Sequence, residues 1–159
     1  MREKIVVALD GSKVAESAIP YIVDLVSKLS PEVDREVILL QVLSPVTITR
    51  AMGGGAGPDI SADEKEMEEH RQKALDYLYK TGESLRSKGA MVTPRVAIGN
   101  AAEQIVSVAE EVDANLIAMS THGRSGLSRW ALGSVTDKVL RLESRIPIIV
   151  IRAQQHGPR

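Results

Sequence analysis

The segment between residues 119 and 136 holds the residue types best suited to bind an anion. An apolar run of strand length, Leu116–Met119, precedes it, and apolar residues recur at helical spacing from Val135 onward. A strand, a glycine loop and a helix start in this order present backbone N–H groups and the positive end of a helix dipole. The segment therefore predicts a phosphate site in which Gly123, Gly133 and Ser134 approach the ligand.

Two of these residues have a second interpretation. Ser134 also suits the N-cap of its own helix, with Asp137 three residues later completing a capping box. Gly123 also suits an ordinary turn. The residue types alone leave both interpretations open.

The other polar residues of this loop give weaker signals. No serine, cysteine or carboxylate motif supports His122 as a general base. Arg124 and Arg129 either steer polyphosphate or keep the loop soluble, and Trp130 suits a packing or partner contact better than adenine stacking. His70 lies in a charged helical segment, which does not indicate a metal ligand.

Asp10 ends another apolar run of strand length, Ile5–Leu9. Beside a phosphate site, an uncompensated carboxylate would repel the ligand. If Asp10 lies at the phosphate site, we therefore expect its carboxylate to hold a Mg²⁺ ion that the phosphates also bind. The alternative is a turn residue that accepts hydrogen bonds from the amides of Gly11 and Ser12.

Five apolar segments of strand length alternate with helical patterns along the chain, and the alternation predicts an α/β fold with a parallel sheet. The segments are Lys4–Leu9, Val37–Leu43, Val92–Ile98, Leu116–Met119 and Ile146–Ile151.

Helix signals lie between these segments. Ser12 is expected to cap a helix with an apolar stripe from Ala15 to Leu29, which Pro20 should kink. Ser61–Glu64 reads as a capping box that opens a long helix ending at Gly89. Residues 44–62 are expected to be a flexible loop, with a lid over a ligand as the alternative, and residues 153–159 a disordered tail.

The position of the two chemistry-bearing loops predicts the strand order. Ligands in open parallel sheets bind at the carboxyl ends of strands where the strand order reverses. If the loops after strands one and four serve one site, these strands are neighbours, and the order is 3-2-1-4-5. The position of Pro94 supports this order, because the order places its strand at an edge of the sheet and a proline is tolerated mainly in an edge strand. The chain is thus predicted to be one Rossmann-like domain, an open five-stranded parallel sheet with helices on both faces, over residues 1–152.

The same order leaves Ile146–Ile151 at the opposite edge. A strand so apolar is a poor candidate for an edge exposed to water. We therefore expect a homodimer joined through this fifth strand.

The spacing of the glycine loop is similar to the signature of the universal stress protein family, Gly-x2-Gly-x9-Gly-Ser/Thr. Nine residues separate Gly123 from Gly133-Ser134, and the resemblance extends to Ile5–Ser12 and to residues 133–150. One position differs, because Ser120 stands where the pattern has its first glycine. Its Cβ is expected to crowd a ligand and to weaken binding at worst.

The resemblance implies an ATP or related adenine nucleotide site at the ends of strands one, two and four and at the glycine loop. Carried over position by position, it implies binding by Ala8, Leu9, Asp10, Val42, Met119, Ser120, Gly123, Gly133, Ser134, Val135 and Thr136.

Composition narrows the class of protein further. The net charge is −1 and aromatic residues make up 3% of the 159 residues, which argues against nucleic acid as a partner. No cysteine is present, and no apolar run is long enough for a signal peptide core or a membrane span. These features favour a cytoplasmic protein without a membrane partner.

The sequence therefore predicts a cytoplasmic stress-response protein that binds an adenine nucleotide as a regulatory or sensing ligand and is not an enzyme. It has no Walker lysine and no nucleophile with a positioned base. A nucleotide-free dimeric interaction module is the alternative. A slow ATP-hydrolysing or phosphoryl- or adenylyl-transfer enzyme is a third possibility.

Overall fold

The computed structural model describes residues 2–44, 60–121 and 132–153, and only the backbone of residues 60–63. The described strands form one parallel sheet in the order β3-β2-β1-β4-β5, which confirms the predicted order and the edge position of the strand that contains Pro94. The strands are β1 (Arg2–Leu9), β2 (Asp34–Leu43), β3 (Met91–Ile98), β4 (Leu116–Thr121) and β5 (Ile148–Arg152).

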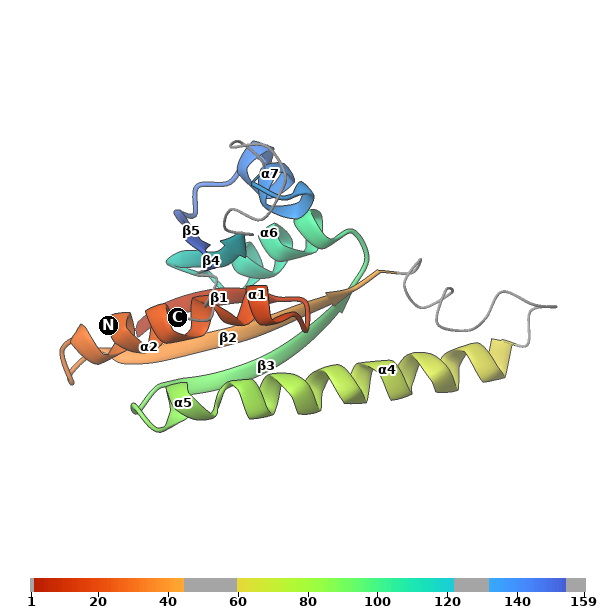
Figure 1. Cartoon of the computed structure of the whole chain (residues 1–159), viewed down its shortest axis with the longest axis horizontal. Helices are drawn as coiled ribbons and strands as arrows, with labels where there is room; N and C mark the ends of the chain where they lie inside the picture. Colours follow the sequence, from red (N-terminus) through yellow and green to blue (C-terminus); the bar gives the residue numbers. More distant parts are fainter. Residues whose placement is uncertain (1, 45–59, 122–131, 154–159) are drawn as a thin grey trace, which may run out of the picture.

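Helices cover both faces of this sheet, as Figure 1 shows. One face carries α1 (Lys13–Glu16), α2 (Ala18–Lys28), α4 (Ile60–Thr81) and α5 (Glu83–Arg86). The other carries α6 (Ala101–Glu111) and α7 (Ser134–Arg141). The chain leaves β1 toward the first face and β4 toward the second, so the neighbouring ends of β1 and β4 are the point where the strand order reverses.

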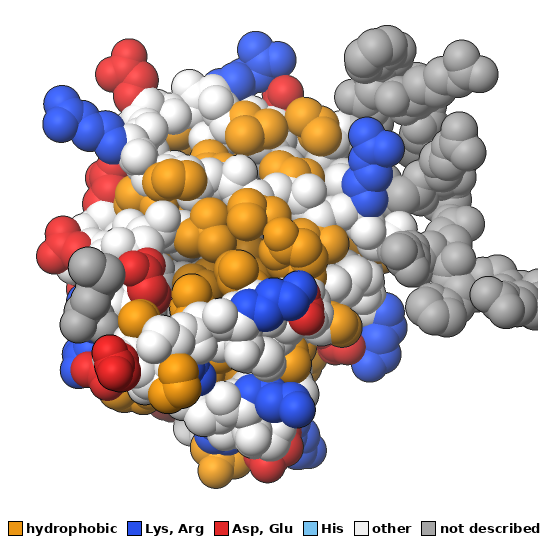
Figure 2. Space-filling model, turned by 90° about the vertical axis from the view of Figure 1, so that its left-hand side faces the viewer, with side chains coloured by type: hydrophobic (Ala, Val, Ile, Leu, Met, Phe, Trp, Pro, Cys, Tyr) orange, Lys and Arg blue, Asp and Glu red, His pale blue; other side chains and the backbone are white. Residues whose placement is uncertain are grey.

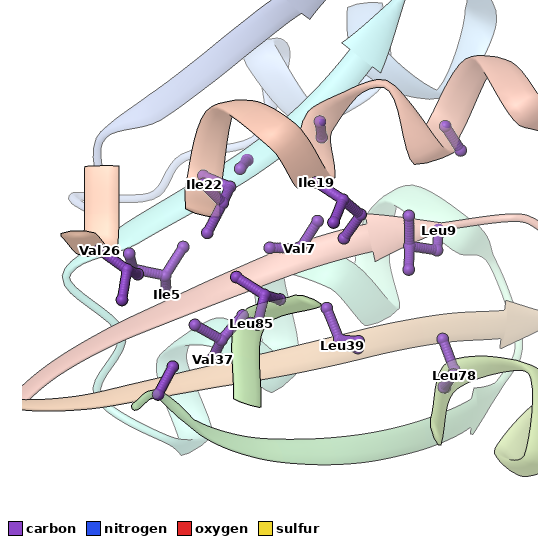
Figure 3. Packing of buried hydrophobic residues seen from close by; sticks show 14 residues of the cluster. Ile5, Val7, Leu9, Ile19, Ile22, Val26, Val37, Leu39, Leu78 and Leu85 are labelled. Carbon is purple, nitrogen blue, oxygen red and sulfur yellow. The ribbon is translucent and has the colours of Figure 1, made fainter. Parts of the chain in front are cut away.

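Alternating side chains of the central strands fill the cores on the two sides. Val7 and Leu39 point toward α2, α4 and α5, where Ile22 and Leu78 are fully buried (Figure 3). The next residues along the strands face α6 and α7 and pack with Ile105, Val106 and Val139. Burying one such side chain contributes roughly 1.5–3 kcal/mol, so the two cores hold the strand ends in fixed positions.

The helix that Pro20 was expected to kink is interrupted three residues before the proline. The helical segment is divided at Ser17, which ends α1 and begins α2. Pro20 is the third residue of α2, where an N–H group has no partner within the helix. Within α2 the proline therefore removes no backbone hydrogen bond.

The helix predicted to end at Gly89 ends instead at Thr81. Gly82 follows with an ordinary helical φ of −76°, and α5 continues to Arg86. A Cβ on Gly82 would lie 2.7 Å from Val92 Cγ1 and 3.1 Å from Leu39 Cδ1. Glycine therefore lets the junction between α4 and α5 lie directly against β2 and β3.

Other predicted boundaries also move, and β1 and β2 begin two and three residues earlier than expected, at Arg2 and Asp34. α4 begins at Ile60, so Ser61 is its second residue and not its cap, and the loop expected over residues 44–62 is shorter. β5 begins at Ile148, two residues later than expected. Ala153, assigned to the tail, is buried and donates its N–H to the Thr121 carbonyl at 3.0 Å. Residues 45–59 and 154–159 lie outside the described part.

One side of the molecule gathers hydrophobic side chains near its centre, at the height where Figure 1 shows β5 (Figure 2). Large exposed apolar side chains include Leu140 and Leu142 at the end of α7.

None of the helices in the described ranges is both long and apolar enough to cross a membrane.

Candidate functional site

A cavity of about 120 Å³ opens at the carboxyl ends of β1, β2 and β4. Its walls come from both faces of the sheet, because α1 lies on one side and the starts of α6 and α7 on the other. The lining residues are Ala8, Leu9, Asp10, Ala15, Leu40, Val42, Ala101, Ile105, Met119, Ser120, Val135 and Thr136. The cavity thus lies where the strand order reverses, the usual ligand position in such sheets.

Most of the residues named from the sequence come together here. Ala8, Leu9, Asp10, Val42, Met119, Ser120, Val135 and Thr136 line the cavity. Gly133 and Ser134 are exposed and lie directly before Val135, at the start of α7. Gly123 lies outside the described residues, as do His122, Arg124, Arg129 and Trp130.

Four lining residues were not singled out from the sequence: Ala15, Leu40, Ala101 and Ile105. Ala15, Leu40 and Ile105 fit the apolar face of a strand or helix and resemble core residues, whereas Ala101 is a small residue at the start of a helix. Ala101 and Ile105 are one helical turn apart at the start of α6. This start follows the carboxyl end of β3, and that position was the available signal.

The start of α7 presents backbone N–H groups beside the cavity. Gly133 has φ 87° and ψ 148°, a conformation that favours glycine, and as the N-cap residue it has no side chain to cap the helix. The first helical hydrogen bond joins the Asp137 N–H to the Gly133 carbonyl at 3.0 Å. The N–H groups of Ser134, Val135 and Thr136 therefore precede the ladder and suit a negatively charged ligand.

The alternative interpretation of Ser134 was wrong. Ser134 is the first residue of α7 and not its cap. Asp137 does not complete a capping box, because its Oδ2 accepts from Arg141 Nε at 2.9 Å. This pair is exposed, and such pairs contribute little to stability.

Asp10 serves the turn after β1 and also lines the cavity. Its Oδ1 accepts from the Ser12 N–H at 2.9 Å. Ser12 Oγ in turn accepts from the Ala15 N–H at 3.1 Å, which confirms Ser12 as the N-cap of α1. The carboxylate therefore has a fixed position and keeps a second oxygen for other partners.

α1 is also held from the side of α4. The Tyr77 hydroxyl donates to Glu16 Oε1 at 3.2 Å. Burial, and then the charge of Glu16, raise the pKa of Tyr77 to about 12. The hydroxyl therefore stays protonated at neutral pH and continues to donate to α1.

Within residues 2–44, 60–121 and 132–153 no group of three or more side chains could hold a metal ion by itself. Asp10 offers a single carboxylate at the cavity. One or two carboxylates together with ligand phosphates form the usual Mg²⁺ site. The donor set thus fits a Mg²⁺ ion that arrives with a phosphate ligand.

The open parallel sheet and the cavity at its reversal point define a Rossmann-like α/β protein. The family model of the universal stress proteins matches residues 1–152, and the chain belongs to that family.

Two relatives match over nearly their whole length. Universal stress protein MJ0577 of Methanocaldococcus jannaschii is 31% identical, with 96% of each chain covered. Universal stress protein YxiE of Bacillus subtilis is 30% identical, with 96% of this chain and all of the relative covered.

Solved structures share the fold. That of MJ0577 has a TM-score of 0.75 at 25% identity and covers 96% of this chain and 97% of its own. A universal stress protein in complex with cAMP has a TM-score of 0.62 at 18% identity, covering 96% and 98% of the two chains. A family protein from Arabidopsis thaliana with AMP bound has a TM-score of 0.64 at 17% identity, covering 96% and 93%.

Proposed function

We propose that this protein binds ATP or a related adenine nucleotide at the cavity, with the base inside and the phosphates at the start of α7. The observation that carries the proposal is the lining of one cavity by eight of the eleven positions that the family resemblance implies. The two fold relatives that hold AMP and cAMP support an adenine nucleotide as the class of ligand.

The size and lining of the cavity support this division of the ligand. A volume of about 120 Å³ is smaller than the 300–1,000 Å³ usual for a complete ligand site, so it suits the base alone. Leu40, Val42, Ile105 and Met119 give it apolar walls. The N–H groups at the start of α7 suit the phosphates, and because Ser134 and Val135 are exposed the phosphates would remain in contact with water.

The Mg²⁺ ion is part of the proposal. The Asp10 carboxylate would hold it together with the phosphates, and the ion would neutralise charge that otherwise repels Asp10. No step of bond cleavage is assigned to the site. The nucleotide acts as a regulatory or sensing ligand in a stress response, and the lack of cysteine suits the reducing cytoplasm.

Mass spectrometry of the freshly purified, denatured protein tests the proposal, followed by calorimetric titration with ATP and Mg²⁺. We expect co-purified adenine nucleotide or saturable binding with one site per chain. An empty protein that shows no titration heat and no thermal shift with ATP, AMP or cAMP would reject the site. The nucleotide-free interaction module would then be the better account.

A further inference from the structure

β4 ends in two hydroxyl residues, Ser120 and Thr121, that point to opposite faces of the sheet. The Ser120 hydroxyl donates to the Ala15 carbonyl of α1 at 3.2 Å. The Thr121 hydroxyl donates to the Leu132 carbonyl at 2.9 Å. The strand end therefore bonds to the chain on both sides of the cavity.

Ser120 completes a chain of hydrogen bonds that begins at Asp10. Asp10 Oδ1 accepts from the Ser12 N–H, Ser12 Oγ accepts from the Ala15 N–H, and the Ala15 carbonyl accepts from Ser120. Asp10, Ala15 and Ser120 all line the cavity. One wall is thus tied at both ends, to the turn after β1 and to β4.

Thr121 fixes the opposite side in the same way. Leu132 leads directly into Gly133 and the first turn of α7, whose N–H groups precede the helical ladder. The Thr121 side chain is buried, and its carbonyl accepts from the Ala153 N–H at 3.0 Å. The approach to α7 therefore has a fixed distance from the sheet.

We propose that Ser120 is a positioning residue for the nucleotide, which sets α1 and the Asp10 carboxylate against the cavity and so strengthens binding. The inference rests on the proposed nucleotide function. It reverses the expectation that a serine in place of the signature glycine weakens binding. A glycine at this position has no hydroxyl to donate to Ala15, so α1 would lose its bond to β4.

The test compares ATP affinity, measured by calorimetry, for the wild type and for Ser120→Ala, Ser120→Gly and Ser120→Thr. Ala keeps the Cβ and removes the donor, Gly restores the family signature, and Thr keeps a hydroxyl. Because one hydrogen bond is worth a few-fold in an equilibrium constant, we expect Ala and Gly to weaken binding by about three- to tenfold. Thr should restore most of the affinity.

A double-mutant cycle separates positioning from a general loss of stability. Ser120→Ala and Asp10→Ala should weaken binding less than additively when combined, because both interrupt the same chain of bonds. Ser27→Ala is the matched control, since Ser27 also donates its hydroxyl to a helix carbonyl, that of Val23 at 2.7 Å, away from the cavity. It should leave affinity unchanged.

Hydrogen exchange of the ligand-free proteins gives a second readout. The Ala15 amide should exchange faster in Ser120→Ala than in the wild type, while the Ser27→Ala protein keeps wild-type exchange there. Equal or tighter ATP binding by Ser120→Gly would overturn the inference and restore the crowding interpretation. A wild type that binds no adenine nucleotide would instead reject the proposed function, and the inference with it.

Discussion

Gly133 brings the backbone to the start of α7 in a conformation that other residues rarely adopt. Among the described residues no heavy atom lies within 4 Å of the position that a Cβ would take, so packing against that part of the chain does not require glycine. The positive φ of 87° is one requirement for glycine at this residue. The phosphate approach that we propose would be a second.

Gly133→Val tests the second requirement. The branched side chain would occupy the phosphate approach, and we expect the affinity for ATP to fall by tenfold or more, as for the loss of about 1.4 kcal/mol of binding free energy. Titration calorimetry of both proteins measures the change.

Gly89→Val is its matched control. Gly89 has φ 82°, equally little around its Cβ position and no part in the cavity. Both variants should lose about 1–2 kcal/mol of unfolding free energy through backbone strain, but Gly89→Val should bind ATP normally. Equal affinity losses in the two would contradict the phosphate site.

Asp10→Asn isolates the charge of Asp10 from its structural bond. The asparagine oxygen can still accept from the Ser12 N–H, so the turn after β1 should remain. We expect the variant to lose the part of ATP affinity that depends on Mg²⁺ and to keep the metal-free part. Titrations with Mg²⁺ and with a chelator measure the two parts, and equal losses in both would refute the metal role.

At the scale of the elements, Gly82 fixes where α4 ends and how α5 meets the sheet. Its helical φ suits any residue, so only packing requires glycine there. Gly82→Ala would place a methyl group 2.7 Å from Val92 Cγ1. We expect the free energy of unfolding, from urea titration, to fall by about 1–3 kcal/mol.

Val92→Ala supplies the compensating change, because it removes the methyl group that Gly82→Ala would meet. The double variant should be more stable than the sum of the two single losses predicts. Strictly additive losses would mean that Gly82 is needed for a reason other than this contact.

Gly82 and Pro20 mark what the sequence could not predict. Local patterns identified the five strands, their order and the cap Ser12, since these depend on neighbouring residues and on chain connectivity. The break at Gly82 depends on Val92 and Leu39, which are distant in sequence. The local pattern also did not predict that α1 would end before Ser17, which places Pro20 in the first turn of α2.

The residues of the cavity also fall into those that the sequence could indicate and those that it could not. Residues next to glycines or at strand ends were recognisable as site residues, whereas Ala15 and Ile105 resemble ordinary core residues. Their position at the cavity follows from the packing of α1 and α6 on opposite faces of the sheet. Only the three-dimensional arrangement distinguishes a residue that lines the cavity from one that fills the core.

At the scale of the whole molecule, β5 leaves one edge of the sheet open. In the described part of the chain β5 pairs only with β4, and its residues Ile148–Ile151 are half-buried. The hydrophobic side chains gathered in Figure 2 lie at the height of this strand in Figure 1. Apolar edge strands invite pairing with another chain, and the homodimer through β5 remains our prediction.

The hydrogen bonds of β5 show which residues would make this pairing. The Pro147 carbonyl accepts from Ile117 and the Ala153 N–H donates to Thr121, so odd-numbered residues bond to β4. Backbone groups alternate in direction along a strand, and the N–H and C=O of Val150 therefore face the open edge.

Val150→Pro removes an edge donor that the single chain does not use. A proline is tolerated at such a position in an edge strand, so the circular dichroism spectrum should stay that of the wild type. Light scattering at micromolar concentration should show a dimer for the wild type and a monomer for the variant. Ile149→Pro is the control, because it removes a bond to β4 and should destabilise the fold itself. A monomeric wild type, or a Val150→Pro protein that remains dimeric, would move the interface away from β5.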